Sequence, residues 1–227
     1  MHSSYAGARR GNQWTFVLLL VATFLFVPLH AMAQAKAQAA TRAGPARTVL
    51  VMGDSLSAAY GLSAPQGWVA LTGARIATSH PGWRVVNASI SGETTAGGAA
   101  RIGAQLKRVK PSVVVIALGA NDGLRGLPLA QTRANLDRMI VASKAAGARV
   151  LLVGMRIPPN YGRDYTQGFE ANYAALAKNR SVPLVPFLLA PIAADRANFQ
   201  EDNLHPVAAA QPKIRDHVWK ALDPLLR

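Results

Sequence analysis

The sequence predicts an α/β fold in which a parallel sheet is covered by helices on both faces. Short apolar runs rich in β-branched residues alternate along the chain with longer segments of helical periodicity, which is the pattern of such a sheet. The chain has 227 residues, of which 50% are hydrophobic, so it can form one domain with a sizeable core. In this class of fold, the ligand site lies beyond the carboxyl ends of the strands.

Five strands are expected, each of them short and apolar. The third is the strongest and is expected at the centre of the sheet. The fifth contains Pro183, which cannot donate a hydrogen bond to a neighbouring strand and therefore predicts an edge position. The strands are predicted at residues 48–52, 84–88, 112–118, 149–153 and 182–185.

Five helices are expected between and after these strands. The third should stop at Gly147, because glycine readily takes the left-handed conformation that ends a helix. The last should begin near Gln211 and Pro212, because proline is tolerated in the first turn. The helices are predicted at about 68–78, 95–109, 129–146, 167–179 and 211–226, with no second domain.

Composition excludes several classes of protein. There is no Cys, which excludes disulfides, thiolate metal sites and a cysteine nucleophile. The net charge is +14, but Lys and Arg are scattered along the chain instead of being clustered with aromatic residues. We therefore read the charge as a solubility feature and expect no nucleic-acid partner.

The N-terminus has the order of a secretory signal: basic, apolar, then small residues. Arg9 and Arg10 precede an apolar run over 14–29, which ends in Ala31-Met32-Ala33. We predict a signal peptide at 1–33, a flexible lead-in at 34–47 and the folded domain at 48–227. The alternative is a retained membrane anchor, but the run is shorter than the roughly 20 residues that span a bilayer. The mature protein is expected to be periplasmic or secreted, without stable membrane insertion.

Candidate functional residues follow the first three strands. Ser55 stands in Gly53-Asp54-Ser55-Leu56-Ser57, where a strand-to-helix turn can hold the hydroxyl above the sheet edge. Gly92 can offer a backbone amide, and Asn121 a side-chain amide, to a negatively charged oxygen. Taken alone, each of the three is more often part of an ordinary turn or helix cap.

A fourth candidate group lies near the C-terminus, at Asp202-Asn203-Leu204-His205. A carboxylate three residues before a histidine can orient the imidazole through Nδ1–H and leave Nε2 free to take a proton from a serine. No second His or close acid cluster accompanies His205, so a metal site is not expected.

In this order, the four groups resemble the SGNH, or GDSL, hydrolase family, over about Thr48 to the C-terminus. Three longer stretches resemble its bacterial periplasmic branch of thioesterase I, arylesterase and lysophospholipase enzymes: 87–95, 121–126 and 156–162. One departure is Asn203, where relatives often have Gly.

The resemblance implies a fold, a site and a reaction. The fold would be a flavodoxin-like three-layer α/β/α sandwich with five parallel strands. Ser55 would be the nucleophile, His205 the general base and acid, and Asp202 its orienting partner. The amides of Ser55 and Gly92 and the side chain of Asn121 would form the oxyanion hole, and Ile157 and Pro158 would flank the acyl chain.

The expected activity is hydrolysis of carboxylic esters through an acyl-serine intermediate, without metal or cofactor. Aryl and alkyl esters, acyl thioesters and lysophospholipids are the expected substrates, and the protein is expected to be a monomer. Two alternatives stay open. One is a carbohydrate O-deacetylase, and the other is a non-catalytic binding protein on the same fold.

Overall fold

A parallel sheet of five strands, in the order β2-β1-β3-β4-β5, forms the middle layer of the protein. The central strand is β3, and its five residues are all buried. The strands are β1 (Arg47–Gly53), β2 (Trp83–Asn87), β3 (Val113–Ala117), β4 (Arg149–Val153) and β5 (Leu184–Val185). The predicted fold class is therefore confirmed, as are the central position of the third strand and the edge position of the fifth.

The computed structural model describes His2 and residues 47–227. The predicted signal peptide, 1–33, and the lead-in up to residue 46 lie outside the residues from Arg47 onward that form the folded unit. The lead-in was predicted to include Arg47, but this residue begins β1. Its amide donates to the Gly82 carbonyl at 2.8 Å, and its guanidinium lies 4.8 Å from the centre of the Trp83 ring.

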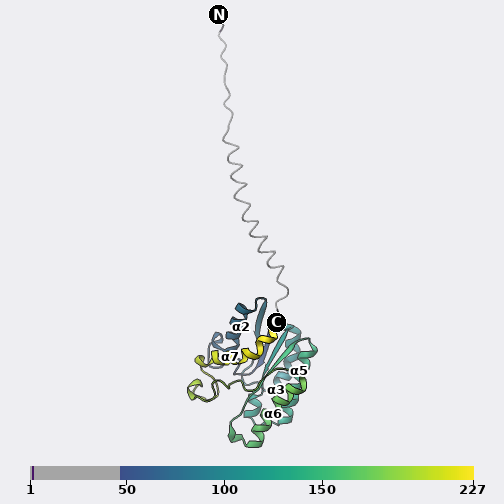
Figure 1. Cartoon of the computed structure of the whole chain (residues 1–227), viewed down its shortest axis with the longest axis vertical. Helices are drawn as coiled ribbons and strands as arrows, with labels where there is room; N and C mark the ends of the chain where they lie inside the picture. Colours follow the sequence, from purple (N-terminus) through teal and green to yellow (C-terminus); the bar gives the residue numbers. More distant parts are fainter. Residues whose placement is uncertain (1, 3–46) are drawn as a thin grey trace. The chain divides into compact units, whose positions relative to one another are not determined.

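Helices cover both faces of the sheet, as Figure 1 shows: α2 and α7 pack together on one face, and α3, α5 and α6 pack on the other. Their bounds are α2 (Trp68–Ser79), α3 (Thr95–Val109), α4 (Ala120–Leu124), α5 (Leu129–Ala145), α6 (Arg163–Arg180) and α7 (Gln211–Leu222). Short 3-10 helices lie at Ala64–Gln66, Pro159–Tyr161, Arg196–Asn198, Ala208–Ala210 and Asp223–Leu226. None of the helices within 47–227 is long and apolar enough to cross a membrane.

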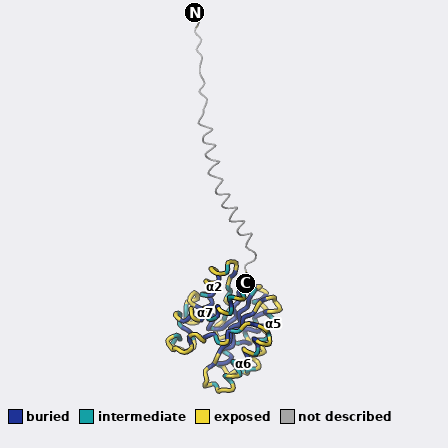
Figure 2. Tube along the Cα trace, in the orientation of Figure 1, coloured by how far each residue is buried: buried dark blue, intermediate teal, exposed yellow. Residues whose placement is uncertain are grey.

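Burial follows the layers (Figure 2). The inner strands β1, β3 and β4 are dark blue in this view, and the outer surfaces of the helices and the loops are largely yellow. Each buried Val, Leu or Ile side chain contributes about 1.5–3 kcal/mol to the stability of the fold. The sheet and the inner helix faces therefore form a stable core beneath the loops at the edge of the sheet.

Four elements differ from the prediction by more than one residue. Helix α7 ends at Leu222, four residues before its predicted end, and the chain continues as the 3-10 helix Asp223–Leu226. Helix α4 was not predicted, because five residues are too few to show a helical period. Helix α6 begins at Arg163, four residues before its predicted start. The prediction missed the first turn because this turn is polar and shows no apolar period. Strand β5 has only two residues, although the Pro183 carbonyl still accepts from the Leu152 amide at 3.0 Å.

The parallel strands bring the candidate residues to one edge of the sheet. The segments after β1, β2 and β3 carry Ser55, Gly92 and Asn121, and the segment after β4 carries Ile157. The sequence predicts this edge as the ligand site.

Candidate active site

Ser55 lies in a series of turns directly after β1. The Asp54 carbonyl accepts from the amides of Ser57 and Ala58, and the Ser55 carbonyl accepts from the amide of Tyr60 at 3.2 Å. The prediction of a strand-to-helix turn here was wrong, since α2 begins only at Trp68. The left-handed conformation of Ala59, with φ of 61°, interrupts the helical run.

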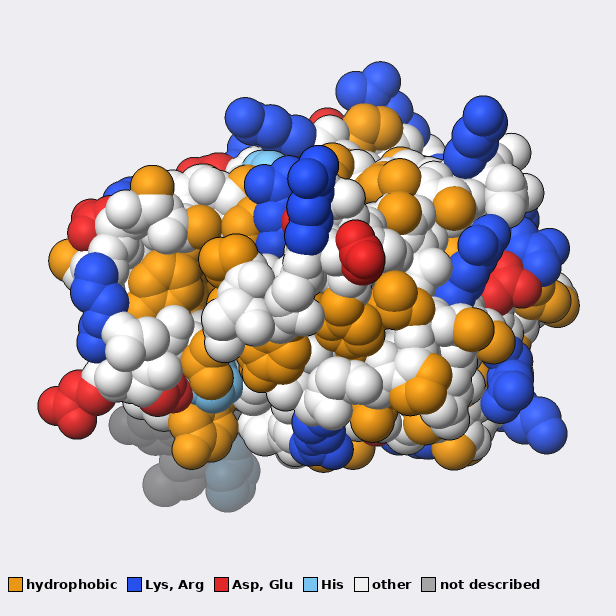
Figure 3. Space-filling view, turned by 90° about the horizontal axis from the view of Figure 1, so that it is seen from below, with side chains coloured by type: hydrophobic (Ala, Val, Ile, Leu, Met, Phe, Trp, Pro, Cys, Tyr) orange, Lys and Arg blue, Asp and Glu red, His pale blue; other side chains and the backbone are white. Residues whose placement is uncertain are grey.

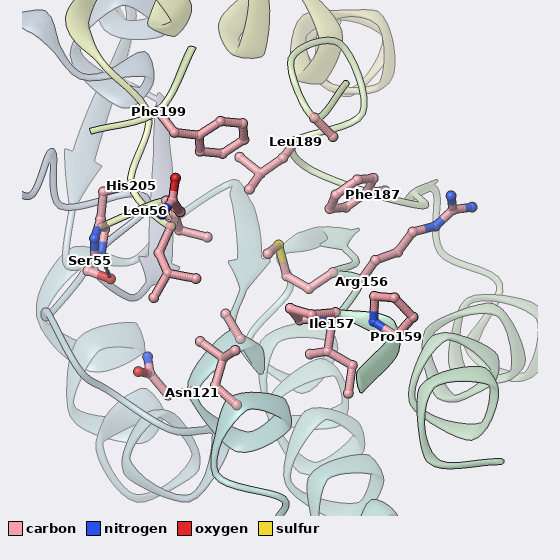
Figure 4. Close-up of a pocket in the computed structure, with 17 residues that line it drawn as sticks. Ser55, Leu56, Asn121, Arg156, Ile157, Pro159, Phe187, Leu189, Phe199 and His205 are labelled. Carbon is pink, nitrogen blue, oxygen red and sulfur yellow. Dashed lines mark hydrogen bonds between the residues drawn. The ribbon is translucent and has the colours of Figure 1, made fainter. Parts of the chain in front are cut away.

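Ser55, His205 and Asp202 form one continuous hydrogen-bonded series. His205 Nε2 lies 2.8 Å from Ser55 Oγ, and His205 Nδ1 lies 2.5 Å from Asp202 Oδ2. The ionised Asp202 carboxylate can only accept a hydrogen bond, so it holds the imidazole proton on Nδ1 and leaves the Nε2 lone pair facing the serine. Figure 4 shows Ser55 and His205 side by side at one end of a cavity.

The Asp202 carboxylate is held ionised by its own loop. Partial burial raises its pKa, but hydrogen bonds from the His205 amide, the His205 ring and the Leu204 amide outweigh this and lower it to about 2. Asp202 therefore carries its charge throughout the neutral range, where a base must be oriented.

The loop between these two residues turns at Asn203, whose φ is 60°. Asparagine is among the few residues with a side chain that take this left-handed conformation readily. The chain thus makes this turn with Asn203.

The two candidate backbone donors are the amides of Ser55 and Gly92, and neither has an acceptor within the described part of the chain. Gly92 has φ of 78°, a conformation that favours glycine. Its carbonyl accepts from Arg125 Nη2 at 3.1 Å, which fixes the plane of the loop. The neighbouring Glu93 forms a largely buried ion pair with Arg101, which anchors the same loop to α3.

Asn121 lies in α4, whose start depends on Gly119. Gly119 has φ of 122°, and a Cβ there would lie 2.1 Å from the Tyr173 hydroxyl. Asn121 Nδ2 donates to the Glu93 carbonyl at 2.9 Å. A side-chain amide has two N–H groups, so one stays available to a ligand.

Two buried carboxylates near these loops were not singled out from the sequence. Asp122 accepts from the Thr95 amide at 2.8 Å and from the Thr95 hydroxyl, and so joins α4 to the start of α3. Asp54 is 1% exposed, and burial raises the pKa of its carboxyl to about 7, although the Leu56 amide donates to it. The sequence signal for both was an acid next to an apolar strand or helix turn.

Asp54 should make stability depend on pH. We expect its contribution to lower the free energy of unfolding as pH rises from about 4 to about 7, because the folded residue keeps a proton that the unfolded residue has released. Asp54→Asn keeps the acceptor oxygen and cannot ionise, so the fall should be smaller in this variant. Urea denaturation of the wild type and of Asp54→Asn, each at about pH 5 and about pH 8, measures this fall in the free energy of unfolding. Equal losses in the two proteins would show that Asp54 does not titrate in this range.

A cavity of about 430 Å³ opens beside Ser55. Figure 4 shows Ser55, His205 and Asn121 toward one end and Arg156, Pro159 and Phe187 toward the other. The predicted residues Ile157 and Pro158 both line it. Further large apolar side chains that the sequence analysis did not assign to the acyl site contribute to the lining, among them Leu56, Met155, Phe187, Leu189, Phe199 and Leu204.

Among the described residues that line the cavity, Arg156 is the only Lys, Arg, Asp or Glu. Figure 3 shows hydrophobic side chains gathered over much of the face seen from below, with Lys and Arg mainly around its edge. Arg156 stacks against the Phe187 ring and pairs with Glu170 at 3.0 Å, so its charge is compensated. No group of three or more acidic, His or Cys side chains arranged to hold a metal ion occurs in 47–227.

Comparison with known proteins gives consistent matches. A model of the GDSL-like lipase/acylhydrolase family matches residues 51–211. Esterase TesA of Pseudomonas aeruginosa PAO1 is 50% identical over 82% of this chain and 92% of TesA. The thioesterase 1/protease 1/lysophospholipase L1 of Escherichia coli K12 is 44% identical over 82% of this chain and 88% of that protein. The arylesterase of Vibrio mimicus is 37% identical over 91% and 98%.

A solved structure matches a similar share of the chain. A crystal structure of TesA superimposes with a TM-score of 0.77 at 50% identity, covering 79% of this chain and 99% of that one. Each similarity spans most of both chains and so concerns the whole domain.

Proposed function

The chain belongs to the GDSL-like lipase/acylhydrolase family and is a serine ester hydrolase, as the sequence predicts, and from this premise we propose that Ser55, His205 and Asp202 are its catalytic residues. The observation that carries the proposal is the hydrogen-bonded series from Ser55 Oγ through the imidazole to Asp202. A serine, a histidine and a carboxylate in this arrangement activate the hydroxyl as a nucleophile.

In the first step, Ser55 Oγ attacks the acyl carbon while its proton passes to His205 Nε2, 2.8 Å away. The amides of Ser55 and Gly92 and the free N–H of Asn121 donate to the carbonyl oxygen as it becomes negative. The bond to the leaving oxygen or sulfur then breaks, and His205 returns the proton to the departing alcohol or thiol.

In the second step, water replaces the leaving group. His205 takes a proton from the water as it attacks the acyl carbon, the bond to Ser55 Oγ breaks, and the serine recovers its proton. Asp202 keeps the imidazole in one orientation through both steps and stabilises its positive form. No metal or cofactor takes part in these steps.

The cavity supports acyl chains as the substrate portion next to the scissile bond. Its lining is mostly apolar and runs from Ser55 to Ile157 and Phe187, which suits a hydrocarbon chain better than an acetylated sugar. We propose aryl and alkyl esters as substrates. By the name of the Escherichia coli relative, thioesterase 1/protease 1/lysophospholipase L1, acyl thioesters and lysophospholipids are proposed too.

The chain-length profile tests this proposal. For p-nitrophenyl esters, kcat/KM should rise with acyl length until the cavity is full, because each buried methylene contributes up to about 0.8 kcal/mol. Ile157→Ser should flatten this rise, since the side chain lines the cavity and the hydroxyl favours water there.

The ratio of kcat/KM between a long ester and the acetate is the quantity to compare. This ratio does not depend on how much of the variant is folded, because unfolding lowers both rates equally. Val141→Ser, at an exposed position on α5, is the matched control and should keep the wild-type ratio. Activity confined to acetylated sugars, with an unchanged profile in Ile157→Ser, would replace the proposal with the deacetylase alternative.

We further propose that the protein is exported and acts as a monomer in the periplasm or outside the cell. The order of basic, apolar and small residues up to Ala33 supports export, and cleavage there would start the mature chain near Gln34 or Lys36. The intact mass of the protein recovered from the periplasm reports where the chain begins.

A further inference from the structure

Exposed apolar side chains gather at the loops that carry the candidate catalytic groups. Within 47–227, four large hydrophobic residues are markedly exposed: Tyr60 and Ile90 at 51%, and Val141 and Leu204 at 43%. Tyr60 lies in the turns after Ser55, Ile90 precedes Gly92 by two residues, and Leu204 adjoins His205. Exposed apolar surface concentrated at one site is typical of ligand binding.

Two hydrogen bonds, one from the amide and one to the carbonyl, hold the backbone of Tyr60 in place. Its amide donates to the Ser55 carbonyl, and its carbonyl accepts from Gln200 Nε2 at 2.9 Å. The same Gln200 nitrogen donates to the Pro206 carbonyl, so one side chain joins the Ser55 turns to the His205 loop. A fixed backbone means that little conformational freedom is lost when a ligand packs on this ring.

The Tyr60 ring covers one face of the His205 imidazole. The ring centres lie 4.4 Å apart, with planes inclined at 36°. No hydrogen bond to the Tyr60 hydroxyl occurs among the described residues, and about half of the side chain is open to solvent. The ring thus offers free aromatic surface next to the group that returns a proton to the leaving group.

This surface lies apart from the acyl cavity. The cavity walls come largely from the segments after β3, β4 and β5, and neither Tyr60 nor Ile90 lines it. Tyr60 follows β1 and Ile90 follows β2, on the other side of the sheet order. With the acyl chain in the cavity, the rest of the ester has to leave the scissile bond toward another surface.

We propose that the exposed ring of Tyr60 forms a leaving-group subsite, on which an aromatic alcohol or thiol portion of the substrate packs. Offset and edge-to-face contacts between aromatic rings are favourable beyond the area that they bury. The proposal rests on the proposed function, because it requires His205 as the acid that protonates the leaving atom. The subsite acts on formation of the acyl-enzyme, since the leaving group is gone before water attacks.

The test compares two esters with the same acyl chain, phenyl butyrate and ethyl butyrate. In Tyr60→Ala, the ratio of kcat/KM for the phenyl ester to that for the ethyl ester should fall about 3- to 10-fold, mainly through KM. Tyr60→Phe keeps the ring and should restore the ratio. Val141→Ala, at another exposed hydrophobic position, on α5 and away from Ser55 in the sequence, is the control.

Burst kinetics separate the subsite from a role in holding His205. If Tyr60 contacts the leaving group, Tyr60→Ala slows the burst of phenol release more than the steady phase, in which the acyl-enzyme is hydrolysed. An unchanged ratio of the two esters, or equal slowing of both phases, would overturn the subsite while leaving the proposed function intact. A wild-type protein without activity on either ester would contradict the proposed function itself.

Discussion

Ser55→Ala and His205→Ala are each expected to lower kcat by about 10³-fold or more. Without the hydroxyl no acyl-enzyme forms, and without the imidazole the hydroxyl keeps its proton, because His205 Nε2 is the base within 2.8 Å of it. Steady-state hydrolysis of p-nitrophenyl butyrate by purified variants measures the loss.

The double variant gives a sharper result than either single one. Groups that act in one step are not additive, so Ser55→Ala combined with His205→Ala should be little worse than either alone. Ser57→Ala is the matched control for the serine, since its hydroxyl is buried two residues away and forms no hydrogen bond among the described residues. A Ser55→Ala protein that is folded and keeps more than about a tenth of wild-type kcat would contradict the nucleophile.

Asn121→Ala is expected to lower kcat by roughly 10²–10³-fold with a small change in KM. An oxyanion donor acts on charge that develops in the transition state, so its loss affects the chemical step more than substrate binding. The measurement is the separate determination of kcat and KM on the same ester.

Asn121 also donates to the Glu93 carbonyl, so a structural role has to be separated from a chemical one. Arg125→Ala removes another side-chain hydrogen bond to this loop, the one to the Gly92 carbonyl, without removing a proposed donor. If Asn121 only positions the loop, both variants should lose similar activity. A much larger kcat effect in Asn121→Ala is the expected result, and near-wild-type kcat would leave Asn121 as a structural residue.

Much of the sheet was predictable because its strands are short runs of buried β-branched residues. The end of α5 was predictable too: Gly147 has φ of 80°, and its amide and that of Ala148 satisfy the last carbonyls of the helix. Helix α4 gave no such signal, because it depends on the conformation of Gly119 and on packing against Tyr173.

Some residues of the candidate site were also predictable from the sequence, and others were not. Ser55, Gly92, Asn121, Asp202 and His205 stand in short motifs that the sequence shows directly. Phe187 and Phe199 in the cavity wall come from irregular segments, in which neither periodicity nor spacing predicts where a side chain lies. Tyr60 is a lone aromatic residue in a turn, and its contact with His205 depends on a loop more than 140 positions away.

Covalent labelling tests the central claim, that Ser55 is the nucleophile. A p-nitrophenyl alkylphosphonate should modify one serine of the active protein, and trypsin should release it in the peptide 48–75, which also holds Ser57 and Ser63. The account predicts that fragment ions place the phosphonate on Ser55 and that the label is absent from Ser55→Ala. A phosphonate found on Ser57, or on any serine other than Ser55, would contradict it.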